Sequence, residues 1–320
     1  MLFSELEGIS VSKVRFGILL PDFPENKSRG QEHVQNIINY LGSLDDVYES
    51  VWLGDHFTLG NMTDMDADIL ECLTALSYLS AKFPNLKFGP LTLASSFRNP
   101  ALLAKITATL SVLSEGKFIL GMGAGWNEEE YRQYGYEFPS NRTRIKQMEE
   151  AIQIIKLLWT QDDVTFKGKY YHVENAYCNP KPDPIPPILI GGGGEKFTLK
   201  AVAMYADWWN GWLYDVKMWT HKLDVLSNHC DDVGRDFDGI LKSMGLAVAL
   251  AGSDEEALKL AKRSPFPFGR RWKIGSPESL VSQVGELVDA GVEYFQLLFT
   301  QFPNHEATQI FADEVIPELS

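Results

Sequence analysis

Three things are scarce in this 320-residue sequence: cysteine, long apolar runs and positive charge. The cysteines are Cys72, Cys178 and Cys230, and their odd number and wide spacing exclude a disulfide framework and a metal cluster. We therefore expect buried free thiols. No apolar run approaches the roughly 20 residues that span a bilayer. The first residues lack a basic cluster, so we predict no signal peptide, no membrane partner and a cytoplasmic location.

The shortage of positive charge has its own consequences. The 29 Lys and Arg residues against 43 Asp and Glu residues give a formal net charge of −14. A negative field of this size argues against nucleic acid as a partner. Any anionic ligand must then be held by local donors, because the overall field repels it.

Hydrophobic periodicity predicts strands that alternate with helices along the chain. The predicted strands are 13–21, 50–57, 86–95, 116–125, 187–191, 207–212, 241–252 and 292–299. The predicted helices are 33–44, 67–83, 101–114, 144–159, 195–206, 218–234, 254–263, 276–291 and 304–319. Eight strand–helix units predict a closed (β/α)8 TIM barrel, with a doubly wound open sheet as the alternative.

The composition changes little along the chain, so we predict one domain over 1–320, with 1–12 as a short N-terminal extension. The polar, aromatic segment 160–187 interrupts the alternation, and we interpret it as an insertion with a short hairpin. The segment 263–275 is aromatic, basic and broken by prolines, which makes it a candidate lid over the barrel.

Barrel active sites lie at the carboxyl ends of the strands. His56, in the run Gly54-Asp55-His56-Phe57, is the only histidine at a predicted strand end. We interpret Asp55 and His56 as a candidate catalytic pair, with His56 as proton donor or partner to a bound ring and Asp55 orienting it. The alternative is a helix-terminal aspartate beside a packed histidine. No metal site is predicted, because no second His or Cys lies at ligand spacing.

Two glycine-rich turns follow other strands. The run GMGAGW (121–126) fits a dinucleotide fingerprint poorly, and we interpret it as backbone that makes room for a flat ligand. Gly191 to Gly194 can point consecutive N–H groups at one anion, next to the predicted helix 195–206. The alternative for GMGAGW is tight packing of strand on helix, and the alternative for the four glycines is a loose turn with a helix cap. The acidic run Glu128 to Glu130 is expected in the first turn of a helix.

Four stretches together are far more specific than either turn. They are VWLGDHF, SSFRNPALLAKITATLSVLSEGKFILGMGAGWNEEEYRQYG, PPILIGGGGEKFTLKAVAMYADWWN and GSPESLVSQVGELVDAGVEYFQLLF. Through them, nearly the whole chain resembles the bacterial luciferase-like oxidoreductases, and most closely the branch that depends on the deazaflavin coenzyme F420. The resemblance implies a (β/α)8 barrel of the luciferase-like type, a flavin or deazaflavin in its mouth, and a homodimer.

The resemblance also implies roles for individual residues. Asp55-His56 matches the Asp-His pair of deazaflavin members, where the histidine faces the ring. Leu91 and Thr92 match a non-prolyl cis peptide behind the ring. The implied cofactor-binding residues are Asp55, His56, Leu91, Thr92, Ala94, Gly123, Ala124, Gly125, Trp126, Gly192, Gly193 and Gly194.

The chain departs from the family pattern at two of these positions. Trp126 stands where deazaflavin-dependent sugar-phosphate dehydrogenases have a catalytic glutamate, which argues against sugar-phosphate oxidation. Ala94 stands where many members have a threonine or asparagine that bonds the ring. Trp126, Trp209, Trp212, Phe57 and the segment 263–275 are candidates for the wall of an apolar substrate site, with core packing as the alternative for the second and third.

The function implied first is F420-dependent hydride transfer to or from a small organic substrate. An FMN-dependent luciferase-like monooxygenase that activates dioxygen is the second hypothesis, because the same barrel serves both. A flavin-binding protein without catalysis is the third.

Overall fold

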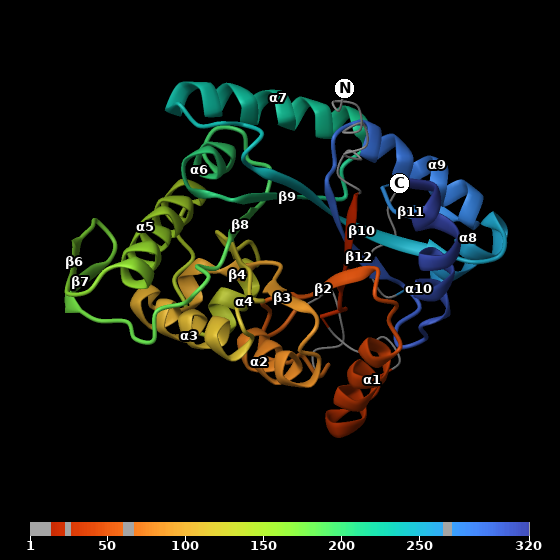
Figure 1. The fold of residues 1–320 in the computed structure, drawn as a ribbon, viewed down its shortest axis with the longest axis horizontal. Helices are drawn as coiled ribbons and strands as arrows, with labels where there is room; N and C mark the ends of the chain where they lie inside the picture. The colour runs from red at the N-terminus through yellow and green to blue at the C-terminus, as the bar shows by residue number, and fades with distance from the viewer. Residues whose placement is uncertain (1–13, 23–26, 60–66, 265–270, 320) are drawn as a thin grey trace, which may run out of the picture.

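The computed structural model describes residues 14–319, except 23–26, 60–66 and 265–270 (Figure 1). The predicted extension 1–12 lies outside the described residues, as does the central part of the candidate lid.

Parallel strands form the wall of a barrel, which confirms the predicted fold. Their order around the wall is β3-β2-β1-β12-β10-β9-β8-β5-β4. The ends of this sheet meet through a parallel bridge between Phe88 and Phe118, with the Phe88 N–H donating to Lys117 O at 2.8 Å. The strands are β1 (Arg15–Leu19), β2 (Tyr48–Leu53), β3 (Lys87–Pro90), β4 (Leu93–Ala94), β5 (Leu120–Gly123), β8 (Ile188–Gly191), β9 (Trp208–Trp212), β10 (Leu241–Leu250) and β12 (Tyr294–Phe299).

The predicted strand 86–95 is two strands in the structure. β3 pairs with β2, and β4 pairs with β5, so the sheet changes neighbours between them. The Leu91–Thr92 peptide bond in this interval is cis, at the position that the family resemblance implied.

The helices cover the outside of the barrel (Figure 1). Several begin at the residues that helix N-termini favour, such as Ser276 before Pro277 and Asn99 before Pro100. The helices are α1 (Gly30–Gly42), α2 (Cys72–Lys82), α3 (Pro100–Leu113), α4 (Glu128–Gln133), α5 (Asn141–Thr160), α6 (Thr198–Tyr205), α7 (Val216–Val233), α8 (Asp254–Arg263), α9 (Pro277–Asp289) and α10 (Glu306–Ile310).

Several predicted boundaries are wrong. α2 begins at Cys72, not at 67, because the Glu71 side chain accepts the Thr74 N–H at 2.7 Å and caps the helix there. α6 begins at Thr198, not at 195. The predicted helix 304–319 is α10 followed by a π-helical turn and a 3₁₀ turn.

Two features lie outside the eight-unit pattern. Within 263–275 the structure has a short strand, β11 (Lys273–Gly275), which pairs in parallel with β10 and was not predicted. The insertion carries the predicted hairpin, antiparallel β6 (Val164–Lys167) and β7 (His172–Ala176), which projects beside α5 (Figure 1). Glu150 of α5 holds the hairpin turn by accepting backbone N–H groups of Lys169 and Tyr170, each at 2.8 Å.

Large side chains fill the barrel interior. Trp52 of β2 is fully buried there beside Gly89, where an added Cβ would lie 2.6 Å from the indole ring. Glycine in the neighbouring strand therefore gives Trp52 its space. The other buried members of this cluster are Leu19, Ile119, Leu189 and Leu298.

The three cysteines are free and buried, as the sequence predicted. No helix among the described residues combines the length and the apolar character needed to cross a membrane.

Candidate active site

Strand β2 delivers Asp55 and His56 to the carboxyl end of the barrel, as predicted. Leu53 is the last residue of β2, and the next residue, Gly54, packs against the side chain of Asp22. Asp22 itself comes just after β1. An added Cβ at Gly54 would overlap the Asp22 carboxylate, so glycine is required for this approach. Two strand ends thus bring two acidic side chains and one imidazole together at the barrel mouth.

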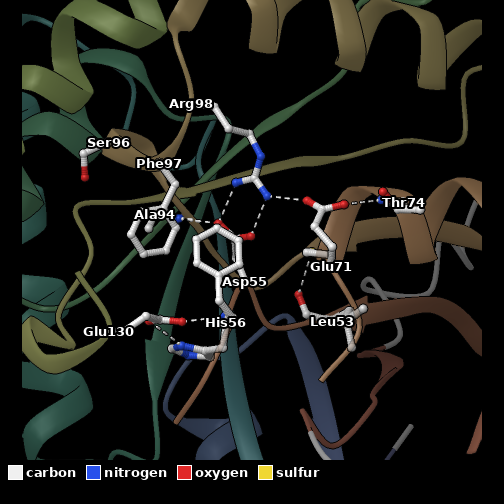
Figure 2. A network of polar contacts seen from close by, with 12 residues as sticks. Leu53, Asp55, His56, Glu71, Thr74, Ala94, Ser96, Phe97, Arg98 and Glu130 are labelled. Carbon is white, nitrogen blue, oxygen red and sulfur yellow. Dashed lines mark hydrogen bonds and ion pairs between the residues drawn. The ribbon is translucent and has the colours of Figure 1, made fainter. Parts of the chain in front are cut away.

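Asp55 is bound to an arginine. The residue is 3% exposed, and its carboxylate forms two parallel 2.8 Å contacts with the guanidinium of Arg98 (Figure 2). It also accepts the Ala94 N–H at 3.0 Å, and Arg98 reaches on to Glu71 at 2.5 Å. The expected orientation of His56 by Asp55 is therefore wrong, because both Asp55 oxygens have other partners. Asp55 joins the end of β2 to β4 and to the start of α2.

The partner of His56 is Glu130, on α4. Glu130 is 1% exposed, and its Oε2 lies 3.1 Å from His56 Nδ1 (Figure 2). Its other oxygen accepts the backbone N–H groups of Phe57 at 2.5 Å and Thr58 at 3.2 Å. One buried carboxylate therefore fixes both the imidazole and the turn that carries it.

The surrounding charges favour the imidazolium form of His56. Burial lowers its pKa, but the hydrogen bond to Glu130 and the negative charges of Asp22, Glu130 and Asp55 outweigh burial, so the pKa is raised. Burial also raises the pKa of the Asp22 carboxyl, and the negative charges of Glu130 and Asp55 raise it further. The charge of His56 and a hydrogen bond from the Gly54 backbone lower this pKa, but the net shift is upward. His56 Nε2 has no hydrogen-bond partner among the described residues. It is available to a ligand.

The cis segment lies between two glycine turns. An added Cβ at Gly191 would lie 2.8 Å from Thr92 Cγ2, and one at Gly123 would overlap the Thr92 hydroxyl. Thr92 therefore packs directly on the backbone of β5 and β8. Leu91 packs against the apolar interior of the barrel. Ala94 is buried, and its N–H is committed to Asp55.

The loop after β5 carries an exposed aromatic ring. Gly125 has φ +76°, and a side chain there would overlap the Tyr131 hydroxyl. Trp126 is 58% exposed, and its ring meets His56 edge-on, with centroids 5.6 Å apart and planes at 75°. Ala124 is partly buried beside this turn. A large apolar side chain thus borders the His56 ring.

The other residues predicted to form the wall of a substrate site differ in their exposure. Trp212 is exposed at the end of β9, and Phe57 packs against Phe97 and Tyr134 with centroids 4.7 and 4.6 Å apart. Trp209 is fully buried, so its interpretation as a wall residue is wrong and the core alternative is correct.

The tetraglycine turn joins β8 to α6, and only part of it offers N–H groups. The Gly192 N–H donates to Asn210 O at 3.0 Å, which removes it from the expected anion site. The N–H groups of Gly193 and Gly194 have no partner among the described residues. Residues Glu195 to Phe197 form a turn, so the glycines are one turn away from the helix itself.

The structure brings the predicted residues to one rim: His56 meets Trp126, while Thr92 touches Gly123 and Gly191. Their roles in cofactor binding stay predictions. The sequence analysis missed Glu130 and Arg98 as members of the site. A lone arginine in the run SSFRNP, just beyond a strand end, was the available clue to Arg98. Glu130 was hidden among three consecutive glutamates, and only the helix geometry shows which one points inward.

The sequence model of the luciferase-like monooxygenase family matches residues 14–271. An F420-dependent glucose-6-phosphate dehydrogenase from Amycolatopsis mediterranei is 28% identical, over 89% of this chain and 94% of its own length. A second protein of that name, from Microbacterium testaceum, is 27% identical over 85% and 89% of the two chains.

Solved structures share the fold. An F420-dependent secondary alcohol dehydrogenase, in complex with an F420–acetone adduct, has a TM-score of 0.81 at 20% identity and covers 96% of this chain and 99% of its own. A long-chain alkane monooxygenase has a TM-score of 0.79 at 16% identity and covers 97% and 91%. The same architecture therefore occurs with different chemistries.

Proposed function

Since the chain belongs to the luciferase-like monooxygenase family, we propose that it is an F420-dependent oxidoreductase that transfers a hydride to or from a small organic substrate. Relatives that match most of this chain carry F420-dependent names, which supports this choice of coenzyme. The observation that carries the proposal is the His56–Glu130 pair at the barrel mouth, with a free imidazole nitrogen beside an exposed indole.

The residues at the mouth suit a coenzyme of this kind. Gly193 and Gly194 offer unpaired N–H groups to a phosphate, which a protein of net charge −14 needs from local backbone. Thr92, Gly123 and Trp126 are the residues that we propose to contact the flat ring of the coenzyme. When bound, F420 supplies the carbon that accepts or releases the hydride.

His56 supplies the proton that must accompany a hydride. A substrate that receives a hydride gains negative charge, and a proton from His56 Nε2 neutralises it. Glu130 holds Nδ1 and stabilises the protonated ring, so the imidazolium is ready as an acid. In the opposite direction the neutral imidazole accepts the proton. Trp126 excludes water from one side of His56.

We propose a small uncharged substrate, such as a secondary alcohol, a ketone or an activated alkene. Glucose 6-phosphate is the substrate named for the relatives above. Trp126, however, places an apolar indole beside His56, at the position where the family resemblance implies a catalytic glutamate for sugar-phosphate oxidation. Oxidation of a secondary alcohol requires a base, which His56 provides, and the indole of Trp126 offers an apolar contact to such a substrate.

The test is cofactor binding. The apo-protein is mixed with F420 and, separately, with FMN, and binding is followed by fluorescence quenching. We expect tight binding of F420. Tight binding of FMN with none of F420 would instead support the dioxygen-activating monooxygenase. Binding of either cofactor without turnover over a panel of alcohols, enones and glucose 6-phosphate would support the non-catalytic alternative.

We further propose that the protein is a cytoplasmic homodimer built from one domain per chain. Exposed apolar side chains on neighbouring helices support a dimer: Leu102 and Leu113 of α3 and Tyr78 of α2. Light scattering after size-exclusion chromatography should give about 72 kDa, twice the 36.0 kDa of one chain. A mass near 36.0 kDa would contradict the dimer.

A further inference from the structure

Strand β9 holds the tetraglycine turn at a single residue, Gly192. The Trp209 indole N–H donates to the Gly192 carbonyl at 2.8 Å, and the Gly192 N–H donates to the Asn210 carbonyl at 3.0 Å. Gly192 has φ +112°, which side-chain-bearing residues rarely adopt. Both hydrogen-bonding groups of this residue are therefore occupied by the barrel wall.

The bond to Trp209 fixes the direction of the next N–H group. The Gly192–Gly193 peptide is trans, and in a trans peptide the carbonyl and the following N–H point in opposite directions. Because the Gly192 carbonyl faces Trp209, the Gly193 N–H faces away from it. This N–H has no partner among the described residues, so it is directed at whatever lies beyond the turn.

Trp209 is itself held rigidly. It is fully buried and stacks on Trp219 of α7, with ring centroids 4.7 Å apart and planes at 7°. The Trp219 indole N–H donates to Ala290 O at 3.2 Å, just beyond α9. Neither ring can rotate without losing a hydrogen bond and the stack. The Trp209 ring is thus fixed, and its own N–H is the group that holds the Gly192 carbonyl.

Further hydroxyls lie against the same turn. The Tyr214 hydroxyl packs against Gly193, where an added Cβ would overlap it, and the Thr198 hydroxyl lies 2.8 Å from an added Cβ at Gly194. Burial raises the pKa of Tyr214, so its hydroxyl keeps its proton at neutral pH. These donors and the two free N–H groups form a set that suits a phosphate group.

We propose that Trp209 is a positioning residue for the phosphate of the cofactor: its indole N–H locks the Gly192 peptide so that the Gly193 N–H points at the phosphate. This inference rests on the proposed function, because it takes a phosphate-bearing flavin or deazaflavin as the ligand. Trp209 touches no ligand. Its contribution should therefore appear only in the phosphate gain, which is the ratio of the dissociation constants of the phosphate-free and the phosphate-bearing cofactor.

The test compares cofactors with and without phosphate. F420 and its phosphate-free deazaflavin fragment form one pair, and FMN and riboflavin form the other. Dissociation constants are measured by fluorescence quenching for the wild type, Trp209→Phe and Trp219→Phe. The second variant is the matched control, because it removes an equally buried indole N–H from the same stack but leaves the bond to Gly192.

We expect Trp209→Phe to weaken binding of the phosphate-bearing member about tenfold, the size of one charge-assisted hydrogen bond. Binding of the phosphate-free member should change less than about twofold, and Trp219→Phe should retain the full phosphate gain. If Trp209→Phe proves poorly folded, benzothienylalanine at position 209 keeps the ring shape and removes only the N–H.

An unchanged phosphate gain in a folded Trp209 variant would overturn the inference, as would a wild type that gains nothing from phosphate in either pair. A wild type that binds FMN and not F420 overturns the proposed coenzyme alone. The FMN–riboflavin ratio then decides the role of Trp209.

Discussion

At the residue scale, the proposed catalysis depends on His56 and on its hydrogen-bond partner Glu130. His56→Ala removes the proposed proton donor but leaves the tetraglycine turn and Trp126 in place. We expect the cofactor dissociation constant to stay within a few-fold and turnover to fall about a hundredfold, a typical contribution of acid–base help. Stopped-flow measurement of single-turnover rates checks this. A turnover rate equal to that of the wild type would remove His56 from the mechanism.

Glu130→Gln tests the charge behind His56. Gln keeps an oxygen for the Phe57 and Thr58 N–H groups but removes the negative charge that raises the His56 pKa. In the wild type the proton donor is lost as pH rises through this raised pKa. In the variant the pKa is lower, so the loss should begin at lower pH.

The measurement is the pH dependence of kcat/KM in the direction of substrate reduction. The falling alkaline limb should move toward lower pH in Glu130→Gln. Glu128→Gln is the control, because Glu128 lies on the same helix but is exposed. Superimposable profiles for Glu130→Gln and the wild type would show that Glu130 does not control the titration.

At the element scale, the Asp55–Arg98 ion pair connects β2, β4 and α2. Arg98→Met leaves the Asp55 carboxylate buried without its cation, and breaking such a buried pair costs about 3–5 kcal/mol. The free energy of unfolding in urea measures this. The matched control is Lys87→Met, which breaks a half-exposed ion pair between β3 and Glu49 of β2 and should cost less than about 1 kcal/mol. Equal losses in the two variants would contradict the structural role of Arg98.

The secondary-structure elements also show how much of the fold the sequence predicts. Strand and helix periodicity gave the alternating elements, because burial of one face imposes that period on the sequence. It failed at α2, whose start depends on the Glu71 cap, and at β11, a strand too short to show a period. It also missed the Glu130–His56 contact, because that contact joins residues 74 positions apart. The Leu91–Thr92 cis bond came from the family resemblance and not from any local pattern.

At the scale of the whole molecule, the net charge of −14 should oppose the arrival of an anionic cofactor. Salt screens this repulsion, and the screening length falls from about 30 Å at 0.01 M to about 10 Å at 0.1 M ionic strength. Association of F420 should therefore accelerate over this range. Stopped-flow quenching gives the rate, and the phosphate-free deazaflavin, whose rate should change little, is the control. A rate that falls with salt would indicate a cationic entry path instead.

The different partners of Asp55 and His56 have a consequence for sequence comparison. The two residues are adjacent in the chain, yet one is bound to Arg98 and the other to Glu130. Substitutions among relatives should therefore co-vary as two independent pairs, 55 with 98 and 56 with 130. A relative that loses the pair 55–98 can keep its chemistry, whereas one that loses the pair 56–130 should have exchanged its reaction for another.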